Sequence, residues 1–212
     1  MANHIIKICG IRDPEIATQA ALAGVNFIGI VFHPLSPRYV SLGQAATISN
    51  AASNAGALPV AVFVNHSNIE MRRICEAADI QIIQLHGATA RAHHHLLPNK
   101  YQRIYVKTLS DKGELQTDDG LRYLDPDRDF VLIDHAGPGQ GNSINRLGFH
   151  YDLPFPWILA GGLSPSNVVD AINDLQPDGV DVSSGVESSK GNKDIYLIQR
   201  FVASVRNHNH AA

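Results

Sequence analysis

Short apolar runs rich in β-branched residues recur along the chain, and longer stretches with helical patterning separate them. Runs of roughly four to eight such residues are typical of buried strands. Strands that alternate with helices pair in parallel, because each crossover returns the chain to the same end of the sheet. We expect eight strands, at Ile5–Cys9, Phe27–Phe32, Leu58–Val64, Ile80–Leu85, Arg103–Thr108, Phe130–Asp134, Trp157–Ala160 and Gly179–Val182.

Signals for helix starts and ends lie between the strands. Asp13-Pro14 is typical of an N-cap followed by proline at the first helical position, and Gly24 is placed to end that helix. Ser67-Asn68-Ile69-Glu70 is a capping-box pattern ahead of a helix at Asn68–Ala78.

Ser164-Pro165 repeats the cap-and-proline pattern before a helix at Val168–Leu175. A last helix is expected at about Asp194–Val205. The weakest pattern is that of the fifth helix, within Asp111–Leu124, where two glycines interrupt the periodicity.

Eight strand–helix units predict an α/β protein with the architecture of a parallel (β/α)8 barrel, or TIM barrel. No linker or low-complexity segment divides the chain, so we expect a single domain over residues 1–212. The units are short, but the length falls within the range of such barrels. A doubly wound open sheet gives the same alternation and is the structural alternative. The absence of a Gly-x-Gly-x-x-Gly pattern after the first strand weakens it.

Composition narrows the class of function. The formal net charge is −3 and no run of lysine or arginine stands out, so we expect no binding to nucleic acid or anionic membranes. No apolar stretch approaches the roughly 20 residues of a spanning helix. Only two cysteines occur, Cys9 and Cys75, which fits a reducing cytoplasm.

In such barrels the active site lies at the C-terminal ends of the strands. Alternation along the first strand directs Cys9 and Lys7 inward together, and along the last strand it does the same for Asp181 and Ser183. Asp134 ends the sixth strand and also points inward. The polar residues at strand ends are Cys9, His33, Asn65, Gln84, His86, Lys107, Asp134 and Ser183.

Cys9 and Asp134 are the candidate catalytic pair. A core cysteine is most often a small apolar residue, and we keep that interpretation for Cys75. Cys9 differs because it ends a strand, is followed by Gly10, and shares its face with Lys7, which could favour the thiolate. An aspartate after a strand can be a helix cap, but glycines follow Asp134 closely, so a functional acid is favoured.

Two glycine-rich turns follow the seventh and eighth strands, where barrels often bind phosphate. Gly161-Gly162 lies in the first turn and Ser183-Ser184-Gly185 in the second. Backbone N–H groups in such turns and at helix starts suit an anion. We therefore expect a phosphorylated small molecule as substrate, bound partly by these two turns.

The eleven histidines do not form a metal motif. His93, His94 and His95 are consecutive, so on a helix they point in different directions and cannot share one ion. We expect no metal site. Gly137-Pro138-Gly139-Gln140-Gly141 lacks the following Gly-Lys-Ser/Thr of a P-loop.

Six ordered segments, all at strand ends, resemble the phosphoribosylanthranilate isomerase family. They are Lys7-Ile8-Cys9-Gly10-Ile11, His33-Pro34-x-Ser36-x-Arg38-Tyr39-Val40-Ser41, Val62-Phe63-Val64-Asn65, Gln84-Leu85-His86-Gly87, Leu159-Ala160-Gly161-Gly162-Leu163-Ser164-Pro165-x-Asn167-Val168 and Gly179-Val180-Asp181-Val182-Ser183-Ser184-Gly185-Val186-Glu187.

The resemblance implies an Amadori rearrangement in tryptophan biosynthesis. N-(5-phosphoribosyl)anthranilate becomes 1-(o-carboxyphenylamino)-1-deoxyribulose 5-phosphate, with no cofactor. By resemblance, Asp134 is the general acid that protonates the ribose ring oxygen, Cys9 the base that removes the C2′ proton, and Arg38 the ligand of the anthranilate carboxylate. The other expected substrate-binding residues are Gly161, Gly162, Asp181, Ser183, Ser184, Gln84 and His86.

One departure from the family lies after the sixth strand. Its usual Gly-Gly-Ser/Thr-Gly loop and following aromatic pair are replaced by Gly137–Arg146, with Ile144 and Arg146 in place of the aromatics. The acid and the base are unaffected, whereas the contribution of this loop to phosphate binding is open. The sequence leaves the protein as a monomer or homodimer.

Three other functions compete. A metal-dependent sugar-phosphate epimerase would need more strand-end ligands than His86 and Asp134. An indole-glycerol-phosphate synthase would need inward lysine and glutamate; Lys7 and Lys107 are available, but no inward glutamate ends a strand. A barrel that only binds a phosphorylated ligand or partner is disfavoured by the intact Cys9, Asp134 and Arg38.

The first and last strands must be neighbours in a closed barrel. Lys7 and Asp181 both point inward from them, one layer below Cys9. A lone buried charge is costly, so we expect these two side chains to form a hydrogen-bonded ion pair.

Overall fold

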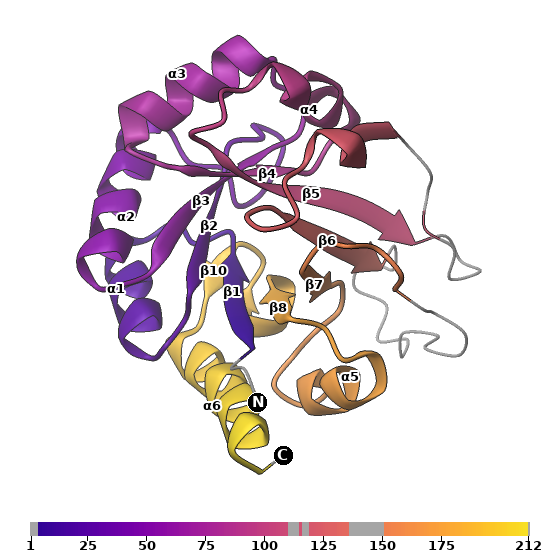
Figure 1. Cartoon of the computed structure of the whole chain (residues 1–212). Helices are drawn as coiled ribbons and strands as arrows, with labels where there is room; N and C mark the ends of the chain where they lie inside the picture. The colour runs from indigo at the N-terminus through magenta and orange to yellow at the C-terminus, as the bar shows by residue number, and fades with distance from the viewer. Residues whose placement is uncertain (1–3, 110–114, 116–118, 136–150, 212) are drawn as a thin grey trace.

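The computed structural model describes residues 4–109, 115, 119–135 and 151–211, and its strands close into one barrel (Figure 1). All neighbouring pairs in the closed sheet are parallel, and β1 pairs with both β2 and β8. The predicted (β/α)8 class is therefore confirmed, and the open sheet is excluded. The barrel strands are β1 Ile5–Cys9, β2 Phe27–Val31, β3 Leu58–Phe63, β4 Ile82–Leu85, β5 Gln102–Leu109, β6 Phe130–His135, β7 Trp157–Ala160 and β8 Gly179–Val182.

The strand bounds match the sequence within one residue, except at the start of β4. Ile80 is fully buried but lies in the turn that terminates the preceding helix instead of extending the strand. Its N–H donates to the carbonyl of Cys75, and Asp79 before it takes a left-handed conformation with φ of 50°. This helix-terminating turn delays the strand to Ile82.

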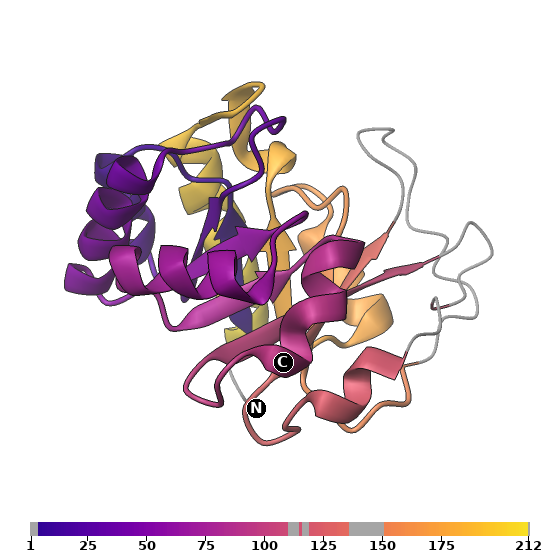
Figure 2. The same ribbon diagram turned by 90° about the horizontal axis from the view of Figure 1, so that it is seen from above.

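Six α-helices and three 3-10 helices are described. Figures 1 and 2 show α1, α2 and α3 side by side outside the first strands, and α5 and α6 outside the last ones. They are α1 Pro14–Leu22, α2 Leu42–Asn54, α3 Asn68–Ala78, α4 Ala88–His93, α5 Val168–Leu175 and α6 Ile195–Ala211, with 3-10 helices η1 His94–Leu96, η2 Asp119–Tyr123 and η3 Ser184–Val186.

Two of the three predicted caps are confirmed. Asp13 accepts the N–H of Glu15 at the start of α1, and Ser67 forms a capping box with Glu70 at the start of α3. The third is wrong, because α5 has Asn167 at its N-cap position. Ser164 lies in the turn before it and donates its N–H to the side-chain oxygen of Asn167.

The fifth helix also differs from expectation. Within Asp111–Leu124, the described residues form the 3-10 helix η2 and, at Leu115, an isolated antiparallel bridge to Leu109. Gly120 allows the close approach there, since a Cβ on it would lie 2.1 Å from the Tyr105 hydroxyl oxygen. The prediction of an α-helix in this stretch is therefore wrong for the residues that the structure describes.

A short antiparallel hairpin that the sequence did not predict follows β8 and η3. Its strands are β9 Glu187–Ser189 and β10 Asn192–Lys193, joined through Gly191. The final helix α6 then begins at Ile195, where Asp194 accepts the N–H groups of Tyr196 and Leu197. It runs six residues beyond the predicted end at Val205.

The apolar residues form two separate layers, one inside the barrel and one between its strands and the helices. Ile6 and Ile8 of β1 point outward and are fully buried in the outer layer, as alternation predicts. The inner layer consists of Phe27, Val60, Ile82, Ile104, Val106, Phe130, Leu132, Ile158 and Ala160, with Ile5 packed against it.

A buried ion pair joins the two strands that close the barrel. Lys7 of β1 and Asp181 of β8 are register partners, and Lys7 Nζ lies 2.9 Å from Asp181 Oδ1. Lys7 is fully buried. Burial opposes its charge, but attraction to Asp181 and Cys9 outweighs burial and raises the pKa of Lys7 above its ordinary value. The predicted pair is confirmed.

Removing one partner should strand the other charge inside the barrel. We expect Lys7→Met to lower the free energy of unfolding by about 3–5 kcal/mol, measured by urea unfolding followed by circular dichroism. Lys100→Met is the matched control, since Lys100 pairs with Glu76 on the surface and its loss should change stability little. Adding Asp181→Asn to Lys7→Met should restore part of the loss. A single variant as stable as the parent would contradict this role.

Candidate active site

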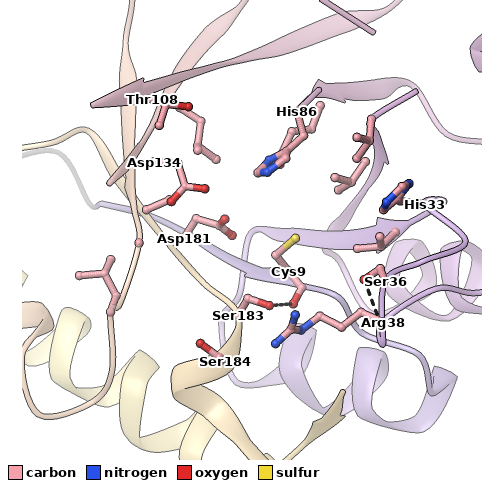
Figure 3. Close-up of a pocket in the computed structure, with 18 of the residues that line it drawn as sticks. Cys9, His33, Ser36, Arg38, His86, Thr108, Asp134, Asp181, Ser183 and Ser184 are labelled. Atoms are coloured by element: carbon pink, nitrogen blue, oxygen red, sulfur yellow. Dashed lines mark hydrogen bonds between the residues drawn. The ribbon is translucent and has the colours of Figure 1, made fainter. Parts of the chain in front are cut away.

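A cavity of about 550 Å³ opens at the C-terminal ends of the strands (Figure 3). All ten site residues chosen from the sequence line it, and they come from the ends of six strands and the loops that follow. They are Cys9, Arg38, Gln84, His86, Asp134, Gly161, Gly162, Asp181, Ser183 and Ser184.

Cys9 ends β1, and its thiol points into the cavity (Figure 3). The space for the sulfur comes from Gly29 on β2, where a Cβ would lie 3.0 Å from Cys9 Sγ. Burial and the neighbouring Asp181 raise the pKa of the thiol, while Lys7 and Lys193 lower it by a smaller amount. Lys7 acts in the predicted direction, but Cys9 is a thiol at neutral pH in the unliganded protein.

Asp134 enters the same cavity from β6, where register pairs it with Thr108 and Ala160. Burial, with a further contribution from the negative charge of Asp181, raises its pKa from 3.8 to about 6. A carboxyl group with such a pKa is protonated roughly one-tenth of the time at pH 7, about a hundred times more often than at its ordinary pKa. This is the property required of a general acid.

Gln84 and His86 line the wall between these two residues. Gln84 is buried, and its Oε1 has no hydrogen-bond partner among the described residues. Buried polar atoms are rarely left unpaired, so a ligand hydroxyl or N–H is the expected partner. Burial and the charge of Lys7 lower the pKa of His86, so its imidazole is neutral at pH 7.

Arg38 reaches the cavity from the loop after β2. Its aliphatic stem lies over Gly10, where a Cβ would meet Arg38 Cδ at 2.4 Å. Gly10 also has a φ of 82°, which L-residues rarely adopt. On its other side, Arg38 donates from Nε and Nη2 to the carboxylate of Glu187, at 2.6 and 2.9 Å.

The two predicted phosphate turns lie together on one side of the cavity. Gly161 and Gly162 follow β7 with φ values of 95° and 64°, while Ser184 begins η3 after β8. Ser183 donates its hydroxyl to the carbonyl of Cys9 at 3.0 Å (Figure 3). This bond ties the second turn to the strand that carries the thiol.

Several lining residues were missed as site residues. Ser36 and Thr108 complete the polar wall together with His33, which the sequence predicts at a strand end but does not assign to the site. Val31, Val62, Val64, Leu132 and Leu163 provide an apolar wall. Alternation could have found Thr108, because it shares a face with Asp134 across the β5–β6 register. The expectation that Lys107 points inward is wrong. Register partners in a parallel sheet point to the same face, and Ile133, the partner of Lys107, belongs to the outer layer. Asn65 does not line the cavity.

Metal chemistry finds no support in the described ranges, where no three His, Cys, Asp or Glu side chains gather as ligands. His93 ends α4, while His94 is buried in η1 with its ring against Tyr105.

No helix in the described part of the chain is long and apolar enough to cross a bilayer. The segment Gly137–Arg146, whose sequence differs from the usual loop of the family, lies outside the described residues. Cys75 is buried, and burial raises its pKa to about 12, consistent with a structural role.

Comparison with known proteins identifies relatives of the whole chain. A profile of the family described as N-(5'phosphoribosyl)anthranilate (PRA) isomerase matches residues 6–204. N-(5'-phosphoribosyl)anthranilate isomerase 2 of Arabidopsis thaliana is 38% identical over 210 residues, which cover 95% of this chain and 74% of the relative. The isomerase of Chlamydia felis is 36% identical over 202 residues, covering 95% and 96%. That of Neisseria meningitidis is 38% identical over 205 residues, covering 93% and 94%.

Solved structures agree with the sequence relatives. Phosphoribosyl anthranilate isomerase from Thermotoga maritima superposes with a TM-score of 0.79 at 29% identity, covering 96% of this chain and 99% of that one. A structure of such an isomerase in complex with reduced 1-(o-carboxyphenylamino)-1-deoxyribulose 5-phosphate gives 0.78 at 28% identity, with the same coverage. The family profile, the full-length relatives and the shared barrel together show that this chain belongs to the phosphoribosylanthranilate isomerase family.

Proposed function

We propose that this protein is an isomerase of tryptophan biosynthesis that rearranges N-(5-phosphoribosyl)anthranilate to 1-(o-carboxyphenylamino)-1-deoxyribulose 5-phosphate by general acid–base catalysis. Family membership supports the reaction. The observation that carries the mechanism is the placement of Asp134 and Cys9 in one cavity, the first with its pKa raised to about 6.

Asp134 performs the first step as the general acid. Its carboxyl proton passes to the ribose ring oxygen while the C1′–O bond breaks, and the anthranilate nitrogen supplies the electron pair. The ring opens to a protonated Schiff base, and Asp134 is left as a carboxylate. Burial favours this step, because a carboxyl group with a raised pKa is a better match for operation near neutral pH.

Cys9 performs the second step as the base. This step starts from the form of the enzyme that carried its proton on Asp134 and has Cys9 as a thiolate. The thiolate sulfur takes the C2′ proton and becomes a thiol, and the C–H electron pair moves towards the positively charged iminium nitrogen to give an enolamine. That compound becomes the ketone by moving its hydroxyl proton to C1′. The iminium charge lies beside the thiolate when it forms, and Lys7 below it adds a second positive charge.

The remaining cavity residues bind the substrate. Backbone groups of Gly161–Gly162 and Ser183–Ser184 hold the phosphate, as their turn geometry favours. Arg38 holds the anthranilate carboxylate, and the apolar wall packs on its ring. Gln84 supplies its unpaired Oε1 to a ribose hydroxyl, with His86 and Asp181 beside it.

We also propose the setting of the enzyme. It works in the cytoplasm, where both of its unpaired cysteines stay reduced. It acts as a monomer or homodimer; the isomerase of Thermotoga maritima is described as dimeric. It uses no cofactor and has no nucleic acid or membrane partner.

A fluorescence assay that follows loss of phosphoribosylanthranilate tests the function directly. Turnover that is unchanged by a chelator supports the proposal. Turnover abolished by the chelator would favour a metal-dependent enzyme on this fold, and tight binding without turnover would favour a barrel that only binds a phosphorylated ligand.

Loss of either catalytic group should nearly abolish turnover. We expect Cys9→Ala and Asp134→Asn each to lower kcat by at least about 100-fold, the usual contribution of a positioned acid or base. Cys75→Ala is the matched control, because Cys75 is buried in α3, in the outer apolar layer, and does not line the cavity. Near-normal kcat in either active-site variant would refute its role.

The raised pKa of Asp134 also predicts a pH-dependent cost to stability. Its folded form prefers the protonated state, so its contribution to stability is present below the unfolded pKa of 3.8 and is lost as pH rises through about 6. Asp134→Asn should therefore be more stable than the parent at pH 7.5, by about 2–3 kcal/mol. The difference should shrink towards pH 4 in urea titrations. A constant difference across this range would mean that the Asp134 pKa is ordinary.

Arg38→Ala should weaken substrate binding rather than catalysis. Loss of a charge-assisted pair with a carboxylate is expected to cost about 1.5–3 kcal/mol. The measurement is the affinity for the reduced product analogue and for the same compound without its carboxyl group. Equal losses for both ligands would show that Arg38 does not bind the carboxylate.

A further inference from the structure

Arg38 is held by a carboxylate from the other end of the chain. Glu187, the first residue of β9, receives Arg38 Nε at 2.6 Å and Nη2 at 2.9 Å. The Glu187 side chain is 5% exposed and that of Arg38 20% exposed, so the pair is largely shielded from water. A bidentate contact of this kind fixes the plane of the guanidinium as well as its position.

A guanidinium group has two edges on which a carboxylate can form a bidentate contact. Glu187 occupies the edge formed by Nε and Nη2, and Arg38 Nη1 takes part in none of the side-chain hydrogen bonds described. The second edge, formed by Nη1 and the remaining proton of Nη2, is left for another carboxylate. Arg38 lines the cavity, so such a carboxylate would belong to the bound ligand.

Glu187 is itself fixed by two further donors. Lys193 Nζ of β10 lies 2.7 Å from Glu187 Oε1, and the N–H of Gly191 donates to Oε2 at 3.1 Å. Burial alone would raise the pKa of Glu187, but the bonds from Arg38, Lys193 and Gly191 lower it to about 2. The carboxylate is therefore charged at every working pH, and it cannot rotate away without losing four hydrogen bonds.

Lys193 connects this group to the catalytic strand. Its side chain is 2% exposed, and Nζ also donates to the carbonyl and hydroxyl oxygens of Ser183, at 2.9 and 3.3 Å. Ser183 in turn donates to the carbonyl of Cys9. A continuous line of polar contacts thus runs from the arginine that faces the ligand to the strand that carries the thiol.

The hairpin also contacts the loop that carries Arg38. Gly191 lies against that loop, where a Cβ would be 2.6 Å from the carbonyl oxygen of Pro37. The contact is close because Gly191 lacks a side chain, and its φ of 85° suits glycine. The hairpin and the loop after β2 are therefore held together by the Arg38–Glu187 pair and by backbone packing.

We propose that Glu187 is a positioning residue that determines specificity: it holds one edge of Arg38, with Lys193 as its counter-charge, so that the other edge selects substrates bearing a carboxylate on the aromatic ring. This inference rests on the proposed function of the cavity. A pair that only joined the hairpin to the barrel would affect stability, but it would not distinguish ligands with and without that carboxylate.

The test measures ligand discrimination in Glu187→Gln. Affinities are determined for the reduced product analogue and for the same compound without its carboxyl group, beside KM and kcat for phosphoribosylanthranilate. We expect about 10-fold weaker binding of the carboxylated analogue, less than about 2-fold change for the other, and a raised KM with kcat within about 3-fold. Lys190→Ala, an exposed substitution in the same hairpin, is the matched control and should match the parent in every measurement.

A double variant provides the second test. In an Arg38→Ala background, Glu187→Gln should add less than about 2-fold to the loss of affinity, because Glu187 acts through Arg38. If Glu187→Gln does not fold, Glu187→Asp replaces it: the shorter side chain keeps the charge beside Lys193 but cannot keep both bonds to Arg38, so the same ligand discrimination is expected.

Equal loss of both ligands, a fall in kcat with unchanged KM, or additive losses in the double variant would overturn the positioning role. These results leave the proposed function intact as long as the parent turns over phosphoribosylanthranilate. Failure of the parent to do so would instead reject the proposed function.

Discussion

The ion pair between Lys7 and Asp181 joins the first and last strands of the barrel, and the geometry of the candidate active site is built on it. Two charges inside a barrel are tolerated only because each neutralises the other at 2.9 Å. Cys9 lies one inward position above Lys7 on β1, and Asp134 experiences the charges of both partners. The same pair thus fixes the closure of the sheet and sets the electrostatic surroundings of the two groups proposed to move protons.

Three glycines determine how closely the residues of the site can approach one another. Gly29 leaves room for the Cys9 sulfur, Gly10 lets the Arg38 stem cross the first strand end, and Gly191 brings the hairpin against the loop after β2. At each of these positions a Cβ would lie within about 3 Å of the neighbouring group. The close packing around the cavity therefore depends on glycine at three separate places, inside β2, directly after β1 and in the turn of the hairpin, rather than on any single loop.

Alternation predicted much of this structure because a barrel strand has one inward and one outward face. It placed Lys7, Cys9, Asp134 and Asp181 correctly. It failed for Lys107, since apolar residues on both faces of β5 left the phase of the strand ambiguous. Alternation could not identify Glu187 as the partner of Arg38. The two residues are 149 positions apart, and the hairpin that carries Glu187 has no apolar pattern. Alternation also could not predict the pKa of the Cys9 thiol, because burial raises it by more than Lys7 lowers it.

The pKa values of the two groups proposed as acid and base lie in the order opposite to the one that these proposed roles require. Asp134 must donate a proton, yet it loses its proton near pH 6, below the raised pKa of the Cys9 thiol that must accept one. Between those two pH values the enzyme carries a single proton shared by the pair, and only the minor tautomer has it on Asp134. The fraction of that tautomer is independent of pH. The proposed roles therefore imply activity that is level across this interval and an acidic limb that belongs to Asp134. They also imply that the competent form reacts faster than kcat, which is averaged over both tautomers.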